Sequence, residues 1–426
     1  MSKLAVIGSG YVGLTTGACF AHLGHDVVCA DIDVSKVERL QQGEVPILEA
    51  GLEDLVREGL SNDRLAFVVG ASAAVPDAEF VYLCVPTPQA PDGSADLSHI
   101  EAAAREIAPL LKPDSIVVNK STVPVGSTHF VEQALGRSDV HVVSNPEFLR
   151  EGSAVNDFLH PDRVVVGCDD QAAAIRVASL YLGVPAPFMV TDPASAETIK
   201  YASNAFLATK LSFVNAIAAL CEAVGADVED VVLGMGYDKR IGHEFLRPGP
   251  GWGGSCFPKD SRALLYVANQ AGYPFELLEG VIAVNEEQLD RIAGKVLAAI
   301  AADPAPATVA VWGLTFKANT DDLRESPALQ VIRRLLDHGV RVKAYDPTVS
   351  GPLAGYDGLE ISADPYSACT GSTALAVLTE WDEFRWLDFE KVADEMMSPR
   401  VVDGRNLLDR KALERRGFTY EGVGRT

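Results

Sequence analysis

Hydrophobic runs alternate with amphipathic segments through about the first 190 residues of the chain. Apolar runs near 4–7, 27–30, 65–69, 80–85, 116–118, 141–143 and 164–167 predict buried strands. Helical patterns lie between most of them, at 14–23, 35–41, 51–59, 98–111 and 171–182. Buried strands that alternate with helices form a parallel sheet covered on both faces, so this part is predicted to be a doubly wound α/β domain.

The pattern changes after residue 193. Residues 194–233 keep helical periodicity with few breakers before Gly225, and a second helical block covers 276–302. Residues 302–308, rich in alanine and proline, predict a linker. Strands are then expected at 308–313, 340–345, 374–378 and 400–402, with helices at 326–338 and 384–396. We therefore predict two doubly wound parallel-sheet domains, residues 1–193 and 303–426, joined by a central helical region, residues 194–302.

Composition and charge narrow the class of protein. A net charge of −23 argues against a partner that is nucleic acid or an anionic membrane, although a local cation cluster can still bind a phosphate. Seven scattered cysteines without metal-ligand spacing favour a reducing compartment and no metal site. A strand pattern begins at the N-terminus, and the most apolar helical stretch is shorter than the ~20 residues of a membrane span. A soluble cytoplasmic protein is expected.

Residues 4–33, "LAVIGSGYVGLTTGACFAHLGHDVVCADID", carry the pattern of a dinucleotide-binding turn. Gly8 permits a tight turn, Gly10 lets the backbone approach a pyrophosphate, and Gly13 lets helix and strand pack closely. The helix N-terminus attracts the phosphates. Asp31 can accept hydrogen bonds from ribose hydroxyls and would repel a 2′-phosphate, which favours NAD over NADP. Asp33 is the competitor for this role, or it caps the next helix. A Rossmann-like fold is predicted.

Two further turns end predicted strands with threonine. Thr87 lies in "YLCVPTP" and Thr122 in "NKSTVPVGST". Ligands of such sheets bind at the carboxyl ends of the strands, so both residues are candidates to face the cofactor. Taken alone, each threonine is more typical of an ordinary turn residue than of a cofactor contact.

Two pairs of polar residues recur at a spacing of four. Glu147 and Glu151 would share one face of a helix, either as functional carboxylates or as a solvated acidic face. Lys200 and Asn204 would share a face of an otherwise apolar helix, where an ammonium and an amide can hold a developing oxyanion. Lys200 could instead be a surface lysine.

The segment "PGPGWGGSCFPKD", residues 248–260, predicts a shaped loop, because glycine and proline weaken helices and strands. It carries Cys256, followed closely by Lys259 and Asp260. The cysteine is either incidental to a structural turn or a presented nucleophile.

The motifs VIGSGYVGL, CVPTP, STVPVGS, NPEFLREGSA, KYASNAF, NAIAALCEAVGAD, GPGWGGSCFPKD, GLTFKANTDDLRESPA and YDP occur in this order over nearly the whole chain. In this respect the sequence resembles the nucleotide-sugar 6-dehydrogenases of the UDP-glucose/GDP-mannose dehydrogenase family. The cysteine loop is most similar to the branch that acts on UDP-glucose. The resemblance implies a four-electron oxidation of the sugar C6 alcohol to a carboxylate, giving UDP-glucuronate while two NAD⁺ are reduced. It also implies an NAD-binding domain (1–193), a central dimerisation domain (194–302) and a UDP-sugar-binding domain (303–426).

The second oxidation explains why the reaction would need a cysteine. After the first hydride leaves, the Cys256 thiolate can add to the aldehyde, and the thiohemiacetal can lose a second hydride to give a thioester that water hydrolyses. The resemblance implies that Lys200 and Asn204 stabilise the alkoxide, with Lys200 and less directly Lys259 favouring the thiolate. It implies that Asp260 and Thr122 hold a proton-relaying water.

The remaining site residues are also implied by the resemblance. Glu147 would act as the base of thioester hydrolysis, and Glu151 would support that network or touch the sugar. The implied cofactor-binding residues are Gly8, Gly10, Tyr11, Val12, Gly13, Asp31, Lys36, Pro86, Thr87, Thr122, Glu151, Lys259 and Arg324. The implied substrate-binding residues are Glu147, Phe148, Leu149, Arg150, Glu151, Lys200, Asn204, Arg240, Phe245, Leu246, Gly253, Cys256, Phe316, Lys317 and Arg405.

Charged residues among these have more specific expected roles. Lys317 and Arg405 would meet the diphosphate. Arg240 would reach the substrate of the neighbouring subunit in a homodimer or higher homo-oligomer built across the central helices. Arg324 contacts a ligand or forms a capping salt bridge. The sequence departs from relatives at Ala50, where proline is common, and at Trp252, where phenylalanine or tyrosine is more usual and which could reshape the sugar pocket.

Other functions remain open at this stage. A two-electron NAD-dependent hydroxy-acid dehydrogenase would share the Rossmann domain and helical middle but would not need Cys256. A non-catalytic NAD sensor or scaffold would be expected to lack one of the candidate residues, and all are present. The same chemistry on a UDP-N-acetylhexosamine or GDP-mannose is the third alternative.

Overall fold

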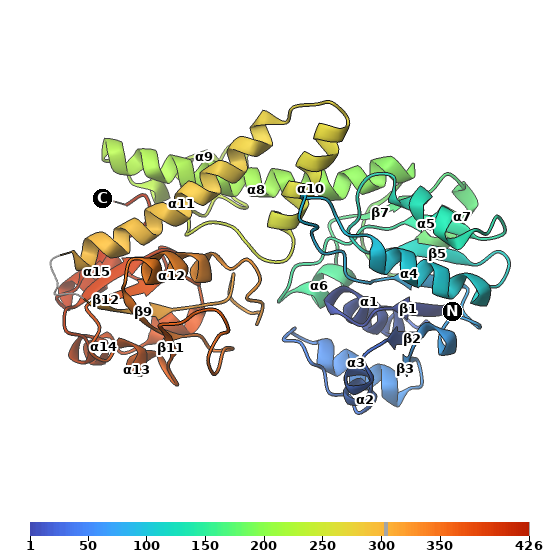
Figure 1. Ribbon diagram of the computed structural model, residues 1–426, viewed down its shortest axis with the longest axis horizontal. Helices are drawn as coiled ribbons and strands as arrows, with labels where there is room; N and C mark the ends of the chain where they lie inside the picture. The colour runs from blue at the N-terminus through green and yellow to red at the C-terminus, as the bar shows by residue number, and fades with distance from the viewer. Residues whose placement is uncertain (302–305, 426) are drawn as a thin grey trace. The chain divides into compact units, whose positions relative to one another are not determined.

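The computed structural model describes residues 1–301 and 306–425 and divides into two compact units (Figure 1). The first unit is Met1–Ser203 with Arg262–Tyr273, and the second is Asn204–Ser261 with Pro274–Thr426. Two helices, α8 (Pro193–Val224) and α10 (Phe257–Gln270), contribute residues to both units. The three-domain division expected from the sequence stays a prediction, and residues 302–305 of the expected linker lie outside the described residues.

The first unit is built on an eight-stranded sheet with the order β3-β2-β1-β4-β5-β6-β7-β8. Its strands are β1 (Lys3–Ile7), β2 (Asp26–Asp31), β3 (Leu65–Val69), β4 (Phe80–Leu83), β5 (Ile116–Asn119), β6 (His141–Ser144), β7 (Val164–Gly167) and β8 (Phe188–Thr191). Its helices are α1 (Tyr11–His22), α2 (Val34–Gln41), α3 (Leu52–Ser61), α4 (Ser98–Ile107), α5 (Ser127–Leu135), α6 (Ala154–Leu159) and α7 (Gln171–Ser179), with 3₁₀ turns η1 (Ala71–Ala73) and η2 (Ala108–Leu110). All seven strands predicted here are present. The sequence analysis missed β8, α5 and α6, which are short.

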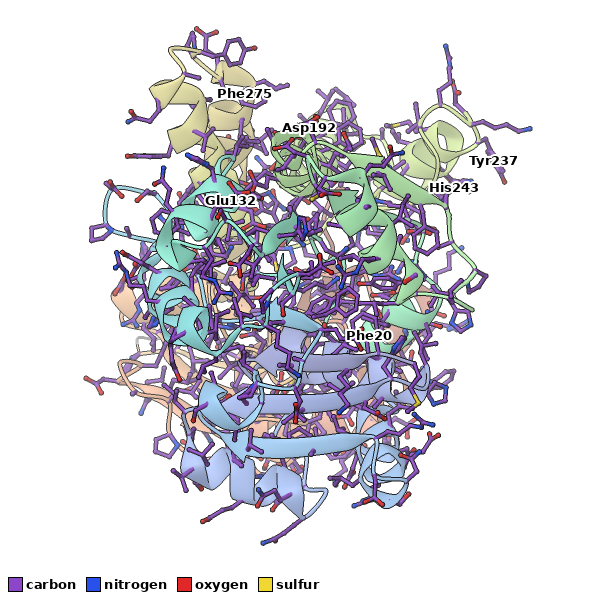
Figure 2. The ribbon with its side chains drawn as sticks, turned by 90° about the vertical axis from the view of Figure 1, so that its right-hand side faces the viewer. Phe20, Glu132, Asp192, Tyr237, His243 and Phe275 are labelled. Atoms are coloured by element: carbon purple, nitrogen blue, oxygen red, sulfur yellow. The ribbon has the colours of Figure 1, made fainter. Side chains whose placement is uncertain are left out.

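Alternate strand residues fill cores on opposite faces of this sheet. Leu4 and Val6 of β1 pack into the core beneath α1 and α3, whereas Ala5 and Ile7 pack with α4 on the other face. Phe20 of α1, labelled in Figure 2, lies in the first core, with the rings of Tyr82, Phe158 and Tyr181 at 5.2, 5.0 and 5.1 Å from its own. The two-faced packing explains why the strands are continuous apolar runs in the sequence.

One strand pair departs from the expected parallel arrangement. β6 and β7 pair antiparallel, through Ser144 and Gly167, while β7 and β8 are parallel to each other. The connection between β6 and β7 contains α6, whose six residues extend only about 9 Å. A helix this short does not return the chain to the opposite edge of the sheet, so β7 runs back in the reverse direction.

The second unit holds a six-stranded, all-parallel sheet with the order β11-β10-β9-β12-β13-β14. Its strands are β9 (Thr308–Trp312), β10 (Arg341–Tyr345), β11 (Leu359–Ile361), β12 (Ala374–Val377), β13 (Arg400–Asp403) and β14 (Thr419–Glu421). Its helices are α9 (Val228–Gly236), α11 (Glu276–Ile300), α12 (Pro327–Asp337), α13 (Pro365–Cys369), α14 (Phe389–Glu395) and α15 (Arg410–Arg415), with the 3₁₀ helix η3 (Asp382–Trp386). Figure 1 shows α12 on one face of this sheet and α13 and α14 on the other.

The two sheets share one topology. Numbered within each unit, the first six strands of the first sheet and all six of the second follow the order 3-2-1-4-5-6, which is that of a Rossmann domain. The predicted fold class, two Rossmann-like sheets with a central helical region, is confirmed. The helix expected at 384–396 is divided, because Asp388 accepts hydrogen bonds from Glu390 N and Lys391 N and so starts α14 afresh.

The 32 residues of α8 make it, among the described residues, long and apolar enough by length and composition to cross a membrane. The shorter apolar stretch considered in the sequence did not suggest this. One such helix is weak evidence, since a core helix of a soluble protein passes the same test. Glu197, Lys200 and Asn204 are buried polar residues of α8, and such groups are costly on a lipid-facing helix.

A buried carboxylate shapes the carboxyl edge of the second sheet. Asp346 follows β10, and its Oδ2 accepts hydrogen bonds from Leu314 N at 2.7 Å, Thr315 N at 3.1 Å and Trp381 Nε1 at 3.1 Å. The turn after β9 and the loop after β12 are therefore both attached to the end of β10. These are the segments that precede Phe316 and Lys317 and that surround the strand-order reversal.

We expect Asp346→Ala to lower the midpoint of thermal unfolding by several degrees. The substitution leaves buried donors without an acceptor, which costs about 1–3 kcal/mol, and each kcal/mol shifts the midpoint of a domain of this size by roughly 2–4 °C. Differential scanning calorimetry measures the change. Asp337→Ala, at the exposed end of α12, is the control and should melt like the wild type. Equal melting of both variants would remove Asp346 from this role.

Candidate active site

The glycine-rich turn after β1 leaves open space at the start of α1. Gly8 has φ +95°, and a Cβ added there would lie 2.7 Å from the carbonyl oxygen of Cys84. A Cβ at Gly13 would lie 1.8 Å from the carbonyl oxygen of Gly8, so packing alone requires both glycines. A Cβ at Gly10 would meet nothing within 4 Å. Packing therefore does not explain the glycine at position 10. The open space beside Gly10 fits a ligand that approaches the helix N-terminus.

Asp31 closes the same edge of the sheet at the end of β2. Its Oδ2 accepts hydrogen bonds from Ser9 N at 2.9 Å, Ser9 Oγ at 2.6 Å and Lys36 Nζ at 2.9 Å, and its Oδ1 accepts one from Asp33 N at 3.0 Å. Burial alone would raise the pKa of Asp31, but these hydrogen bonds outweigh it and lower the pKa to about 2. Asp33 caps α2 by accepting from Lys36 N, which leaves Asp31 as the carboxylate beside the turn.

The two threonine turns are joined to each other. Thr87 Oγ1 donates to the carbonyl oxygen of Thr122 at 2.8 Å, and Ser121 Oγ donates to the carbonyl oxygen of Val85 at 2.7 Å. The turns follow the neighbouring strands β4 and β5, and Pro86 lies in the first of them. Both predicted cofactor contacts thus occupy the carboxyl edge of the first sheet.

Glu147 and Glu151 do not share a helix face, and that prediction was wrong. Both lie in the loop between β6 and α6. Pro146 disfavours helical geometry before it, and the Glu147 carboxylate turns inward to accept from Leu149 N at 2.7 Å. Glu147 is buried, whereas Glu151 is half-buried.

Glu147 instead pairs with Lys200 of α8. Lys200 Nζ lies 2.8 Å from Glu147 Oε1, and the two side chains are only 5% and 6% exposed. Burial would raise the pKa of Glu147, but the charge and hydrogen bond of Lys200 outweigh it and hold the pKa below its usual value. Two cations lie near the Phe148 ring, with Arg163 Cζ at 3.7 Å and Lys200 Nζ at 5.5 Å from its centroid.

Sequence reasoning missed a second buried lysine near this pair. Lys120 follows β5, and its Nζ donates to Asn145 Oδ1 and Tyr181 Oη, both at 3.2 Å. Burial lowers its pKa to about 8. The available signal was a lysine placed directly at the end of a buried strand.

Glu49 was missed as well, although it precedes the noted Ala50. Its carboxylate is buried and accepts hydrogen bonds from Tyr11 Oη, Gly152 N and Ala154 N, the last two at 2.7 and 2.9 Å. The start of α1 is thereby tied to the loop that carries Glu151. In the same loop, Arg150 Nη2 pairs with Asp157 Oδ1 at 2.5 Å. Val12 packs against the neighbouring core.

In the second unit, Cys256 lies directly before α10. Asp260 N donates to the carbonyl oxygen of Cys256 at 2.8 Å, which is the first hydrogen bond of the helix. None of the seven cysteines forms a disulfide; five are buried, and Cys168 and Cys256 are partly exposed. A helix N-terminus favours a thiolate over a thiol. Cys256 is the one cysteine that combines this position with exposure.

Asp260 is fully buried and bonded on both oxygens. Asn204 Nδ2 donates to its Oδ2 at 2.6 Å, and Lys259 Nζ donates to its Oδ1 at 2.5 Å. Lys200 and Asn204 lie four residues apart on α8, as expected, and each has its own partner. On the same helix, Lys200 bonds to Glu147 in the first unit and Asn204 bonds to Asp260 in the second.

Trp252 anchors the cysteine loop to two helices. Its Nε1 donates to Ser212 Oγ of α8 at 2.8 Å, its N donates to Asn285 Oδ1 of α11 at 2.8 Å, and Asn285 Nδ2 donates back to its carbonyl oxygen at 3.1 Å. The side chain is buried. The indole is turned towards α8 and holds the loop, and its expected influence on the sugar pocket stays a prediction.

The loop is fixed on both sides of Trp252. Gly249 N donates to Asn215 Oδ1 at 2.9 Å, and Gln288 Nε2 donates to the Gly249 carbonyl oxygen at 2.7 Å. A Cβ at Gly253 would lie 1.9 Å from the carbonyl oxygen of Glu325. Only glycine permits this approach, so the loop before Cys256 has little freedom to shift.

Cationic side chains gather at the carboxyl edge of the second sheet. Arg405 follows β13; its Nη2 donates to the Phe316 carbonyl oxygen at 3.0 Å, and its Nε donates to the Leu378 carbonyl oxygen at 2.9 Å. Lys317 follows β9, with its Nζ 5.5 Å from the centroid of the Phe316 ring. In doubly wound sheets this edge, at the strand-order reversal, is where ligands bind.

Two other arginines have acidic partners close in sequence. Arg324 Nη2 lies 2.8 Å from Asp322 Oδ2, and Arg240 Nη2 lies 2.5 Å from Asp238 Oδ2. The salt-bridge alternative thus accounts for the Asp322 contact of Arg324. The Arg240 side chain is 89% exposed.

The segment after α9 is shaped by ring contacts and one strained residue. Tyr237 and His243, both labelled in Figure 2, meet edge to face, with their ring centroids 5.4 Å apart. Phe245 has φ +61°, which is unusual for a bulky side chain, and its ring lies 6.3 Å from that of Phe257. Leu246 is buried. Such strain persists where the surroundings impose it, often at functional sites. Among the described residues, no group of three or more His, Cys, Asp or Glu side chains is placed to hold a metal ion.

Models of one family match most of the chain in three consecutive parts. The NAD binding domain of the UDP-glucose/GDP-mannose dehydrogenase family matches residues 2–184, its central domain matches residues 194–287, and its UDP binding domain matches residues 310–410.

Individual relatives agree over full length. The UDP-glucose 6-dehydrogenase of Rhizobium meliloti (strain 1021) is 46% identical over 435 residues, with 99% of both chains covered. The UDP-glucose 6-dehydrogenase TuaD of Bacillus subtilis (strain 168) is 45% identical over 432 residues, covering 100% of this chain and 94% of the relative. The solved structure of a UDP-glucose dehydrogenase from the hyperthermophilic archaeon Pyrobaculum islandicum is 40% identical with a TM-score of 0.91, covering 100% and 98% of the two chains. The chain therefore belongs to the UDP-glucose/GDP-mannose dehydrogenase family, and its first Rossmann sheet belongs to an NAD-binding domain.

Proposed function

We propose that the chain catalyses the NAD-dependent, four-electron oxidation of UDP-glucose to UDP-glucuronate through a covalent intermediate on Cys256. One structural observation carries the proposal: Cys256 is presented at the N-terminus of α10 by a loop that Trp252 and Gly249 fix to α8 and α11. Relatives at 45–46% identity that bear the name UDP-glucose 6-dehydrogenase support the choice of substrate.

The first oxidation turns the C6 alcohol into an aldehyde. NAD⁺, when bound over the Gly8–Gly13 turn, supplies the hydride acceptor. Lys200 and Asn204 stabilise the alkoxide that forms as the hydroxyl loses its proton, because an ammonium and an amide N–H both favour a developing negative charge on oxygen. Asp260 and Thr122 hold the water that carries the proton away.

The second oxidation requires the nucleophile. The Cys256 thiolate adds to the aldehyde carbon and gives a thiohemiacetal, whose loss of hydride to a second NAD⁺ gives a thioester. Water then attacks the thioester, the C–S bond breaks, and the carboxylate leaves while Cys256 regains its thiol or thiolate form. Glu147 accepts the proton of the attacking water. The lowered pKa of Glu147 keeps the group ionised, and so able to accept a proton, at neutral pH, although it also makes the carboxylate a weaker base.

The diphosphate of the substrate is assigned to Lys317 and Arg405 at the carboxyl edge of the second sheet. Two cations suit a group with two negative charges, and a guanidinium binds phosphate oxygens in a fork. The pocket for the sugar of the substrate is assigned to five further residues: Phe148, Leu149, Phe245, Leu246 and Gly253. The enzyme is proposed to be cytoplasmic, in line with seven cysteines and no disulfide.

The working form is proposed to be at least a homodimer across the central helices. Phe206, Phe213 and Leu220, spaced by seven residues on α8, are 65%, 51% and 56% exposed. An apolar stripe of this kind on a helix suits a self-complementary interface. Arg240, exposed beyond α9, would then serve the partner's substrate.

We expect two NADH to form for each UDP-glucose consumed, with UDP-glucuronate as the product. The measurement combines absorbance at the NADH band with chromatographic quantification of the sugar nucleotide. UDP-galactose, UDP-N-acetyl sugars and GDP-mannose are run in parallel and should react far more slowly. One NADH and an accumulating aldehyde would contradict the covalent mechanism, and preference for another nucleotide sugar would change the substrate alone.

Cys256→Ala is expected to lower acid formation by on the order of 10³-fold or more, since removal of a nucleophile abolishes the covalent route. NAD binding, followed by isothermal titration calorimetry, should be unchanged because the turn at Gly8–Gly13 is intact. Cys168→Ala is the matched control, as this is the other partly exposed cysteine. Normal turnover of Cys256→Ala would return Cys256 to a structural role.

Phe213→Glu is expected to convert the dimer to monomers in light scattering coupled to size-exclusion chromatography. A two-fold interface would bury the new carboxylate twice, and a buried charge without a partner is strongly unfavourable. Leu182→Glu, at a leucine that is 78% exposed outside α8, is the control and should leave the mass unchanged. A wild-type chain that elutes as a monomer at micromolar concentration would refute the proposed interface.

A further inference from the structure

Glu197 is a buried carboxylate on α8 for which the proposed mechanism has no use. Its side chain accepts three hydrogen bonds, from Gly126 N at 2.6 Å and from Thr128 N and Thr128 Oγ1 at 2.8 Å each. All three donors lie at the start of α5, in the same unit as Glu197. The residue itself is 2% exposed.

Local sequence does not supply a cap for α5. Its N-cap residue is Gly126, which has no side chain and φ +96°, and no side-chain cap hydrogen bond is made there. Serine, threonine, aspartate or asparagine would ordinarily accept from the first backbone N–H groups. The acceptor comes instead from α8, about 70 residues away in the sequence. The two segments are thereby fixed to each other.

Between β5 and α5 lies the turn that carries Thr122. Its strand side is held by Lys120 N and Ser121 N, which both donate to the Leu83 carbonyl oxygen at 3.1 Å, and by Thr87 Oγ1, which donates to Thr122 O. Its helix side is held by Glu197. The position of Thr122 along the turn therefore depends on both ends.

The same turn of α8 holds a second segment. Lys200 follows Glu197 by three residues, so both side chains lie on one face of the helix, and Lys200 Nζ is bonded to Glu147 Oε1 at 2.8 Å. One helical turn thus fixes the Thr122 turn through Glu197 and the Glu147 loop through Lys200. These are the groups to which the proposed mechanism assigns proton relay and hydrolysis.

The energetics argue against a purely packing role. Burial raises the pKa of Glu197 above its ordinary value, although the hydrogen bonds from Thr128 and Gly126 act in the opposite direction. A raised pKa in the folded state means that the stability it contributes is present at low pH and lost as the pH rises through that pKa. The ionised form of Glu197 is therefore held at a net cost, which an apolar side chain would avoid.

We propose that Glu197 is a positioning residue, which sets Thr122 with respect to Lys200 so that proton relay can proceed. This inference rests on the role of Thr122 in the proposed function. It concerns how the relay is held in place, and it assigns no contact of Glu197 with substrate or cofactor.

A double-mutant cycle with full-length enzyme tests the inference. Glu197→Gln keeps the shape of the side chain but places an NH₂ group against a backbone N–H donor. Thr122→Ala and Glu197→Gln should each lower kcat by at least about tenfold, and by no more than the roughly 10²- to 10⁴-fold that a proton-transfer group typically contributes. The double variant should be no slower than Thr122→Ala, within about two- to threefold, because both changes disable one unit. KM values for NAD and UDP-glucose should stay near wild type.

Glu132→Gln supplies the matched control. Glu132 is on the exposed side of α5, as Figure 2 shows. The substitution therefore removes a carboxylate from the same helix without changing the turn that carries Thr122. Its kcat should be that of the wild type. Amide hydrogen exchange gives a readout that does not need turnover: Glu197→Gln should speed exchange in residues 120–128, and Glu132→Gln should not.

The outcomes separate cleanly. Multiplicative losses in the double variant, or a Glu197→Gln enzyme with a lower melting temperature but normal kcat and exchange at 120–125, would overturn the positioning role and leave a helix cap. A wild-type kcat for Thr122→Ala would also overturn it. Failure of the wild-type enzyme to give two NADH per UDP-glucose would refute the proposed function instead, and the exchange comparison would still decide whether Glu197 holds the turn.

Discussion

The candidate site depends on a row of buried polar side chains along α8. Glu197, Lys200 and Asn204 lie at spacings of three and four, so they share one face of the helix. A buried polar or charged group needs a partner inside the protein. Each finds it on a different segment: the start of α5, the loop after β6 and the first turn of α10. In the first unit, the start of α5 and the loop after β6 are thus held to one turn of α8 by the cost of leaving its buried polar groups unbonded.

Burial and charge act together on the ionisable groups of the first unit. Asp31 and Glu147 are both partly or wholly buried, yet hydrogen bonds and a neighbouring lysine keep their pKa values low. For Lys120 the balance is reversed: burial outweighs the opposing charge of Glu147 and lowers the pKa of the lysine to about 8. Local pairing, and not burial alone, therefore decides which carboxylates are ionised at neutral pH.

In the second unit, side chains of neighbouring helices hold in place a loop that is rich in glycine and proline. Backbone groups at Gly249 and Trp252 bond to three amide side chains of α8 and α11, which take the place of the ladder that a strand would have supplied. Ser212 Oγ of α8 also accepts a hydrogen bond from the Trp252 indole. The close approach of Gly253 to the carbonyl oxygen of Glu325 further restricts the movement of this loop. Cys256 can then be presented at a helix N-terminus without a regular element before it.

The sequence by itself determined the fold class, most strands and the glycine turn, because those features rest on local periodicity and on spacings within about 30 residues. It also singled out Cys256 and Asp31, whose positions follow from nearby motifs. It did not reveal that Glu147 and Glu151 leave helical geometry, that Glu49, Lys120 and Glu197 are buried partners, or that Trp252 turns to α8. The buried pairings among these outcomes join residues that are 25 to 105 positions apart in the sequence. Only the tertiary structure decides such pairings, since a buried polar group takes whichever partner the packing of distant elements brings within hydrogen-bond distance.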